Sequence, residues 1–215
     1  MSTFLITGAN RGIGAALDKT LTDQGHHVLG TARNHPEYLP LDVTDPAAHS
    51  ALAIQLEGQQ IDTLVCNAGV FLDKGQNLAD GYGAQMWADS FSVNVTGVFL
   101  TVQALLPNLQ MSNAPKIAII GSQMGSDTLA PGGSYIYRAS KAAALNLGRN
   151  LASDLRRLGI AVGVYHPGWV QTDMGGTTAE ITELEAANGL AKRFAALSLQ
   201  TSGCFETWDG RDHPF

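Results

Sequence analysis

Cysteine, long apolar runs and clustered basic residues are all scarce in this sequence. Two cysteines in 215 residues, Cys66 and Cys204, are too few for a disulfide framework, which indicates a reducing compartment. No apolar run approaches the ~20 residues of a membrane span, and the N-terminus lacks the basic region that begins a signal peptide. We therefore expect a cytoplasmic protein with no membrane partner.

The net charge of −6 and the lack of any Lys/Arg run argue against nucleic acid as a partner. The carboxylates do not cluster with metal-ligand spacing, so no metal site is predicted. With 45% apolar and 15% charged residues, the composition is that of an ordinary globular protein. A chain of this length can bury a substantial core and is most simply one domain, residues 1–215.

Short apolar runs alternate with helical patterns along the chain. Such alternation is typical of an α/β fold with a parallel sheet and helices on both faces, so we expect a doubly wound Rossmann fold of about seven strands. The expected strands are Thr3–Thr7, His27–Ala32, Tyr38–Val43, Ile61–Cys66, Lys116–Gly121, Ile160–Tyr165 and Gly203–Trp208, and the expected helices lie in 14–24, 45–57, 81–109, 137–158 and 178–199.

The first expected strand runs into a glycine-rich turn, Thr7-Gly8-Ala9-Asn10-Arg11-Gly12-Ile13-Gly14, which a helical pattern follows. A strand, a glycine-rich turn and a helix together aim backbone N–H groups at a phosphate. Gly8 permits the turn, while Gly12 and Gly14 allow a pyrophosphate and the helix to approach closely. The spacing is G-x-x-x-G-x-G rather than G-x-G-x-x-G, so a glycine-rich corner without a ligand remains an alternative.

In a dinucleotide-binding fold, an acidic residue at the end of the second strand binds the ribose 2′-hydroxyl of NAD. This sequence has Ala32 and Arg33 there, and Arg11 lies inside the glycine turn. Two arginines and no acid fit a 2′-phosphate, which a guanidinium binds in a fork. The sequence therefore favours NADP(H) over NAD(H), with two solvated arginines as the alternative.

Only residues 34–40 separate Arg33 from the next expected strand. A parallel crossover normally takes a dozen or more residues and carries a helix. We therefore expect the helix after the second strand to be missing, which leaves that edge of the sheet less covered near the adenine end of a bound dinucleotide.

Tyr137 and Lys141 are four residues apart and therefore lie on one face of the expected helix. A lysine ammonium beside a phenol favours its ionised form, and a tyrosine with a pKa lowered by about three units from ~10 can act as an acid or base near neutrality. A solvated surface pair is the alternative for this spacing alone.

Several motifs stand in one order along the chain: Thr7–Gly14, Asp42-Val43, Asn67-Ala68-Gly69, Asn94, Ser122, Tyr137-x-x-x-Lys141, and Pro167-Gly168 with Thr172. Together they resemble a short-chain dehydrogenase/reductase. They span Thr7 to Thr172, most of the chain, and the ordered set is specific although each member is weak. The later stretches His166–Gly176 and 202–210 are similar to the small C-factor-like and sniffer-like carbonyl reductases of that superfamily.

The resemblance implies a catalytic tetrad of Asn94, Ser122, Tyr137 and Lys141. Tyr137 would exchange a proton with the substrate oxygen, Lys141 would lower the tyrosine pKa and bind the nicotinamide ribose, and Ser122 would polarise the carbonyl. Asn94 would bind a water that links Lys141 to solvent. The implied cofactor-binding residues are Gly8, Asn10, Arg11, Gly12, Ile13, Gly14, Arg33, Asp42, Val43, Asn67, Ala68, Gly69, Tyr137, Lys141, Pro167, Gly168, Val170 and Thr172.

Two further residues could suggest chemistry but have simpler interpretations. Cys66 is read as a small buried thiol because no histidine partner is evident, and His166, which precedes a proline at a strand end, is read as structural. Substrate loops are expected around 122–136 and 169–180, with a small lid and an open site. The candidate pocket walls are Phe71, Gln123, Met124, Trp169 and Met174.

We expect an NADPH-dependent oxidoreductase, a carbonyl reductase or alcohol dehydrogenase, acting on a small-molecule carbonyl or secondary alcohol. The alternative is a C-factor-like signalling or sensor protein that binds NAD(P). Members of the superfamily often pair into dimers or tetramers, and Ala142, Leu145, Leu147 and Leu151 form an apolar helix face that could serve a homodimer or homotetramer. Packing of that face on the sheet is the alternative.

Overall fold

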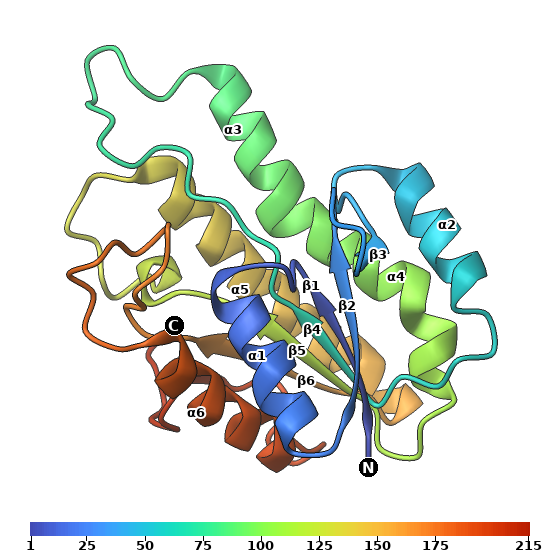
Figure 1. Ribbon diagram of the computed structural model, residues 1–215. Coiled ribbons are helices and arrows are strands. Elements are labelled where there is room, and N and C mark those ends of the chain that lie inside the picture. The colour runs from blue at the N-terminus through green and yellow to red at the C-terminus, as the bar shows by residue number, and fades with distance from the viewer.

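A seven-stranded parallel sheet forms the centre of the computed structural model, which describes residues 1–215 (Figure 1). The spatial order is β3-β2-β1-β4-β5-β6-β7, and every neighbouring pair is parallel. The predicted fold class is therefore confirmed. The strands are β1 (Thr3–Thr7), β2 (His27–Ala32), β3 (Leu39–Pro40), β4 (Thr63–Cys66), β5 (Lys116–Ile120), β6 (Ala161–His166) and β7 (Phe205–Thr207).

Helices cover both faces of the sheet: α1 and α6 lie in front of it in Figure 1, and α2, α4 and α5 lie behind. Side chains alternate between faces along a strand. In β1, Leu5 points into the larger buried cluster with α2, α4 and α5, whereas Phe4 and Ile6 point into the smaller one with α1 and α6. The helices are α1 (Gly12–Asp23), α2 (Pro46–Gln55), α3 (Ala84–Phe91), α4 (Gly97–Gln110), α5 (Tyr135–Leu155) and α6 (Glu183–Ala196).

The strand order changes direction at β1 and β4. From β1 the chain first builds outward through β2 and β3, then returns to place β4 on the other side of β1 and continues to β7. In open α/β sheets, ligands bind outside the carboxyl ends of the strands at such a switch point. The fold therefore places a candidate site beside the ends of β1 and β4.

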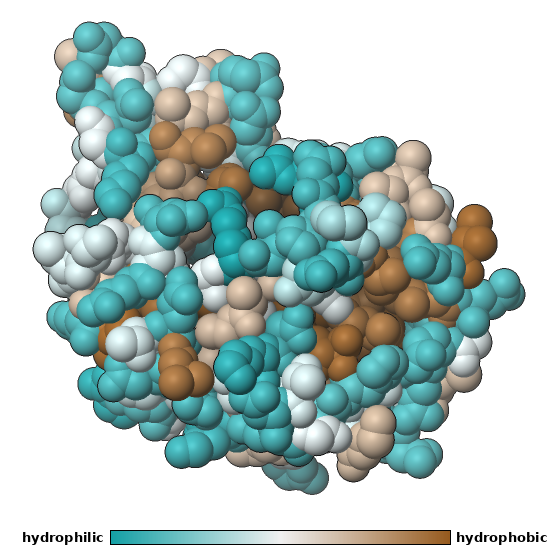
Figure 2. All heavy atoms as spheres, in the orientation of Figure 1, coloured by the Kyte–Doolittle hydropathy of each residue, from teal (hydrophilic) through white to brown (hydrophobic).

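The connection between β2 and β3 contains no helix, as predicted. The third strand is shorter than expected, with only Leu39–Pro40 in the sheet. Proline has no N–H to donate, so Pro40 helps to end the pairing at this edge. Apolar surface is visible at this side of the molecule in Figure 2. Ile54 of the neighbouring helix α2 has an exposed side chain.

Asp45 begins α2 as the sequence predicted. Its side chain accepts a hydrogen bond from the N–H of Ala47 at 2.8 Å, and Pro46 follows at the first helical position. At the start of α6, Thr182 and Glu185 bond each other's backbone N–H groups in a capping box. These local contacts fix where both helices enter the fold.

Residues Ala84–Gln110 form one continuous helical segment, because a π-helical turn, Ser92–Thr96, joins α3 to α4. By length and composition alone this segment could cross a membrane, although polar residues such as Asp89 and Asn94 interrupt its apolar stretches. The same test is passed by core helices of soluble proteins. Here Val102, Leu105 and Leu109 pack in the larger buried cluster, while α3 projects beyond the sheet (Figure 1).

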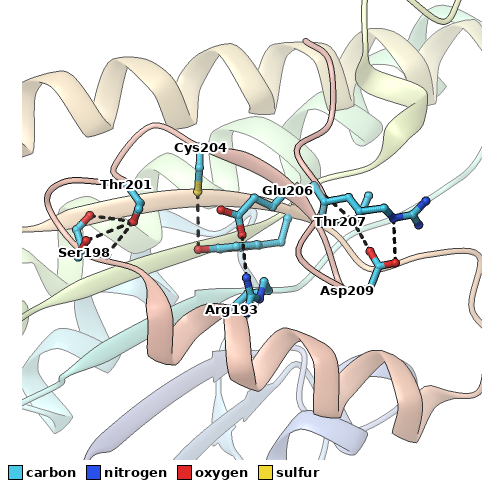
Figure 3. A network of polar contacts seen from close by, with 9 residues as sticks. Arg193, Ser198, Thr201, Cys204, Glu206, Thr207 and Asp209 are labelled. Atoms are coloured by element: carbon cyan, nitrogen blue, oxygen red, sulfur yellow. Dashed lines mark hydrogen bonds and ion pairs between the residues drawn. The ribbon is translucent and has the colours of Figure 1, made fainter.

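Polar contacts hold the last strand against α6 (Figure 3). Glu206 of β7 lies 3.9 Å from Arg193 of α6, and the Cys204 thiol points at the Tyr165 hydroxyl, 3.8 Å away. Burial raises the pKa of the Cys204 thiol to about 11, so the thiol stays protonated at neutral pH. These contacts join β7 to α6 and the Cys204 side chain to β6 at this edge of the sheet.

Candidate active site

A cleft of about 500 Å³ opens beside the carboxyl ends of β1, β4 and β5. The surface is hollowed beneath the projecting α3, and both hydrophilic and hydrophobic residues line the hollow (Figure 2). Most of the residues predicted from the motifs lie on its wall, although they come from distant parts of the chain. The predicted residues that line it are Gly8, Asn10, Arg11, Gly12, Ile13, Gly14, Arg33, Asp42, Val43, Asn67, Ala68, Gly69, Tyr137, Lys141, Pro167 and Thr172.

The glycine turn forms one end of the cleft. Gly8 and Gly12 have φ of 68° and 55°, a region that favours glycine. Gly14 admits no side chain, because a Cβ there would lie 2.1 Å from the carbonyl oxygen of Gly8. The turn is held against the end of β4 by Asn67, whose amide donates to the carbonyl oxygens of Thr7 and Gly8 at 2.9 and 3.1 Å. The arrangement leaves the N-terminus of α1 open toward the cleft.

Two arginines mark the same end of the cleft. Arg11 and Arg33 both line it, and Arg11 forms an exposed ion pair with Asp173, 3.1 Å away, on the loop after β6. An exposed pair of this kind contributes little stability and separates readily. Both guanidinium groups can therefore face an anion.

Asp42 also lines the cleft, but its carboxylate serves the backbone. It accepts hydrogen bonds from the N–H of Thr44 at 2.9 Å and from the Thr44 hydroxyl at 2.7 Å, and these bonds lower its pKa. This is the turn-capping role that short acidic side chains commonly take. The side chain is already bonded, so the carboxylate has less capacity for an adenosine.

Asn94 lies in the π-helical turn, a feature common at functional sites. Its amide donates to the Val70 carbonyl and the Ser140 hydroxyl, each at 2.9 Å, and its oxygen accepts from the Val70 N–H at 2.9 Å. Both amide hydrogens are therefore used within the protein. These bonds fix the loop after β4 against α5 and leave one lone pair of the amide oxygen for another donor. The role inferred for this side chain, as the binder of a water, stays a prediction.

Tyr137 and Lys141 lie on one face of α5, as their spacing predicted, and both are more than nine-tenths buried. The Lys141 ammonium donates to the Ile120 carbonyl oxygen at the end of β5 at 3.0 Å and lies 5.7 Å from the centre of the tyrosine ring. Burial lowers the pKa of Lys141 to about 8. A solvated surface pair is thereby excluded.

The pKa of Tyr137 is raised to about 12, not lowered as the helical spacing suggested. Burial of the phenol is the largest cause, and the negative charge of Asp73 adds to it, while hydrogen bonding toward Ser122 opposes it. Desolvation thus outweighs the nearby ammonium in this structure. The phenol is a proton donor rather than a phenolate at neutral pH.

Ser122 follows β5 and is buried beside the phenol. Its hydroxyl oxygen accepts a hydrogen bond from the Met124 N–H at 3.1 Å, which caps a short 3₁₀ turn, Gln123–Gly125. The hydroxyl hydrogen stays free to rotate toward another acceptor. Ser122 is not among the residues that line the cleft, but its hydroxyl lies next to that of Tyr137, which does line it.

Two predicted cofactor residues do not line the cleft. Gly168 has φ of 91° and packs against Ile181, which a Cβ would approach within 2.5 Å. Val170 is buried and pairs with Ile181 in an isolated bridge. Both positions support the loop after β6 and do not face the cleft.

The predicted pocket walls are only partly correct. Met174 lines the cleft with its sulfur 3.9 Å from the Tyr137 hydroxyl, and the Phe71 ring stacks on the tyrosine ring at 4.2 Å. The other four predicted wall residues, Phe71, Gln123, Met124 and Trp169, are not among the lining residues. The Trp169 indole instead donates to the Gly175 carbonyl at 2.9 Å, within its own loop.

Cys66 and His166 are buried side chains with structural roles. Burial raises the pKa of the Cys66 thiol to about 12, and burial lowers the pKa of His166 to about 4. Leu145 and Leu151 belong to the larger core cluster and Leu147 packs against it, so this face does not support a dimer. An oligomer remains a prediction.

Asp73 is the important residue near the site that the motifs did not indicate. It is only 1% exposed and bonds the first turn of α5. The cleft is also lined by Glu183, which begins α6, and by Asp173. No local pattern distinguishes these carboxylates from surface acids, because the other residues of the site are distant from them in the sequence.

The doubly wound sheet, the glycine turn at its switch point and the buried Tyr–Lys pair define a dehydrogenase-like nucleotide-binding protein. Residues 2–182 match the short chain dehydrogenase family, so the chain belongs to that family of oxidoreductases. It is 35% identical to the 3-oxoacyl-[acyl-carrier-protein] reductase FabG of Escherichia coli over 185 residues, 79% of this chain and 74% of the relative. It is 35% identical to the C-signal protein of Myxococcus xanthus over 159 residues, 72% and 93% of the two chains.

Two carbonyl reductases are among the solved structures that resemble the whole chain. The NADPH-bound carbonyl reductase from chicken fatty liver is 30% identical, with a TM-score of 0.91 over 100% of this chain and 99% of the other. The carbonyl reductase Sniffer of Drosophila melanogaster is 26% identical, with a TM-score of 0.92 over 100% of both chains. The resemblance drawn from the sequence motifs is confirmed.

Proposed function

We propose that this protein is an NADPH-dependent carbonyl reductase that also runs in reverse as an alcohol dehydrogenase. The observation that carries the proposal is the buried pair of Tyr137 and Lys141 on one wall of the cleft, next to the Ser122 hydroxyl. A buried phenol and ammonium at a polar cleft are costly for a fold and are typical of acid–base chemistry.

The residues that line the cleft fit a nicotinamide dinucleotide. The glycine turn and the N-terminus of α1 would hold the pyrophosphate, and Arg11 and Arg33 would bind a 2′-phosphate. Bound NADPH would supply the hydride. The chicken relative binds NADPH, which supports the same choice here.

Tyr137 acts as the acid. Its phenol keeps its proton at neutral pH because its pKa lies near 12, and it donates that proton to the oxygen of a carbonyl as the oxygen gains charge. In the oxidative direction the phenolate takes the proton back. Ser122 donates its free hydrogen to the same oxygen and polarises the carbonyl.

Lys141 supplies positive charge beneath the phenol. With a pKa of about 8 it is mostly charged at neutral pH, and the charge favours the phenolate that remains after proton transfer. Its bond to the Ile120 carbonyl fixes the ammonium in place. Asn94 holds the adjoining loop at Val70 in register with α5.

A second candidate is a signalling or sensor protein that binds NAD(P), favoured by the similarity to the C-signal protein over most of that relative's length. A pure sensor needs a dinucleotide site but no proton donor. The buried Tyr137 and Lys141 therefore favour the enzyme.

Titration of the purified protein with NADPH and with NADH, followed by cofactor fluorescence, tests the proposal. We expect tighter binding of NADPH, followed by its consumption when aldehydes, ketones and quinones are added. NADPH binding without turnover of any carbonyl would favour the sensor. Failure to bind either cofactor would contradict both functions.

A further inference from the structure

The catalytic helix α5 begins without a cap of its own. Ser134, at its N-cap position, has φ of 47° and ψ of 42° and makes no side-chain hydrogen bond to the helix. The first N–H groups of a helix have no partner within the helix and need one elsewhere when they are buried. Tyr137 is the third residue of this helix, so its backbone N–H is one of these groups.

Asp73 supplies the missing partner from 63 residues away in sequence. Its Oδ2 accepts from the Ile136 N–H at 2.9 Å, and its Oδ1 and Oδ2 lie 3.2 and 3.3 Å from the Tyr137 N–H. The carboxylate is almost completely buried. A buried charge is costly unless it is bonded, and the positive end of a helix is a favourable place for it.

The loop that carries Asp73 touches the site at three neighbouring positions. Phe71 stacks on the Tyr137 ring at 4.2 Å, and Lys74 donates to the Met174 carbonyl at 3.1 Å. Asn94 holds the start of this loop through two bonds to Val70. Asn94 thus holds this loop at Val70, and three residues later the Asp73 carboxylate bonds the backbone of Tyr137.

We propose that Asp73 is the positioning residue for Tyr137: its buried carboxylate anchors the first turn of α5 and sets where the phenol stands against the loop after β4. This inference rests on the proposed function. A cap that only stabilised the fold could sit on any helix, whereas this one bonds the backbone of the proton donor itself. Loss of this cap should therefore displace the Tyr137 hydroxyl while the protein remains folded.

The test compares Asp73→Asn and Asp73→Ala with a matched pair at Asp45, which caps α2. Asparagine keeps one acceptor oxygen, so it should retain part of the function that alanine loses. We expect kcat for carbonyl reduction to fall about 10-fold in D73N and about 100-fold in D73A, in line with the loss that misplacement of a reacting group causes. The Kd for NADPH should stay within about 2-fold, since Asp73 is not among the residues that line the cleft. D45N and D45A should leave kcat unchanged.

Amide hydrogen exchange gives a second measurement that needs no turnover. The amides of Ile136 and Tyr137 should be protected in the wild-type protein and in the Asp45 variants, and should exchange at least 10-fold faster in D73A. Unchanged exchange in D73A would overturn the inference, as would unchanged kcat in an active D73A enzyme. If the wild-type protein binds NADPH but reduces no carbonyl, the proposed function fails. The anchoring by Asp73 is then still tested by amide exchange, and an unchanged exchange rate in D73A would overturn it.

Discussion

The ammonium nitrogen of Lys141 lies 3.0 Å from the carbonyl oxygen of Ile120. This bond joins α5 to the end of β5 and places a charge within the core of the protein. Because burial lowers the lysine pKa to about 8 from a usual value of 10.5, the fold is less stable with the lysine charged than it would be with an apolar group there.

Replacement of Lys141 by Met should therefore remove activity without loss of stability. This pKa shift corresponds to a destabilisation of about 3 kcal/mol by the buried charge. Removal of the ammonium also leaves the Ile120 carbonyl without its hydrogen bond, which costs about 1–2 kcal/mol. We expect K141M to be about 1–2 kcal/mol more stable than the wild type at pH 7 by urea unfolding. Between pH 8 and 10.5 the lysine is protonated in the unfolded state but not in the folded state. The free energy of unfolding of the wild type should therefore rise with pH in this window, and the difference in stability between K141M and the wild type should shrink. A less stable K141M at pH 7 would contradict this account of the lysine.

The rate of carbonyl reduction should depend on the same titration. Tyr137, with a pKa near 12, stays protonated throughout the accessible range, whereas Lys141 loses its charge above about pH 8. We expect kcat/KM for reduction to be level below pH 8 and to fall by about 10-fold per pH unit above it. A profile that stays level to pH 10, measured with cofactor at saturation, would show that the lysine charge is not required.

The glycine turn predicts a steric effect on cofactor binding. Gly14→Ala places a Cβ 2.1 Å from the Gly8 carbonyl oxygen, too close for the two atoms, so the turn must open. We expect a loss of about 2 kcal/mol in unfolding free energy and at least a 10-fold weaker NADPH affinity. Gly83→Ala is the matched control, because Gly83 has φ of −57° and no atom within 4 Å of the added Cβ. If G14A binds NADPH as well as G83A does, the glycine turn does not form the pyrophosphate site.

Arg33 should determine the preference between cofactors. A charged hydrogen bond is worth about 1.5–3 kcal/mol, so Arg33→Ala should weaken NADPH binding about 10- to 100-fold and leave NADH binding within about 2-fold. Arg156, at the far end of α5, serves as the control, and R156A should bind both cofactors normally. Equal losses for NADPH and NADH in R33A would place the guanidinium elsewhere than at a 2′-phosphate.

Local chemistry made much of this molecule predictable. The positions of Gly8, Gly12 and Gly14, the start of the helix at Asp45 and the short connection after Arg33 depend on neighbouring residues, and the structure agrees at each of them. The carboxyl ends of parallel strands meet at one edge, so the motifs that follow them converge in one cleft.

The long-range contacts were not predictable in the same way. The bonds between Asp73 and the backbone of residues 136–137, and those between Asn94 and Val70, depend on how loops pack in three dimensions. The spacing of Tyr137 and Lys141 correctly predicted that both side chains lie on one face of a helix. It could not predict the burial that raises the tyrosine pKa, because burial depends on how the whole chain folds.

The central claim is that Tyr137 is the proton donor of a carbonyl reductase, and Tyr137→Phe tests it most directly. This change removes one oxygen and keeps the ring stacked on Phe71, so the cofactor site and the fold should remain intact. The measurement is kcat for NADPH-dependent reduction of a carbonyl, with the Kd for NADPH determined on the same sample. We predict a fall in kcat of at least about 100-fold with an unchanged Kd. Turnover by Y137F at the wild-type rate would contradict the account.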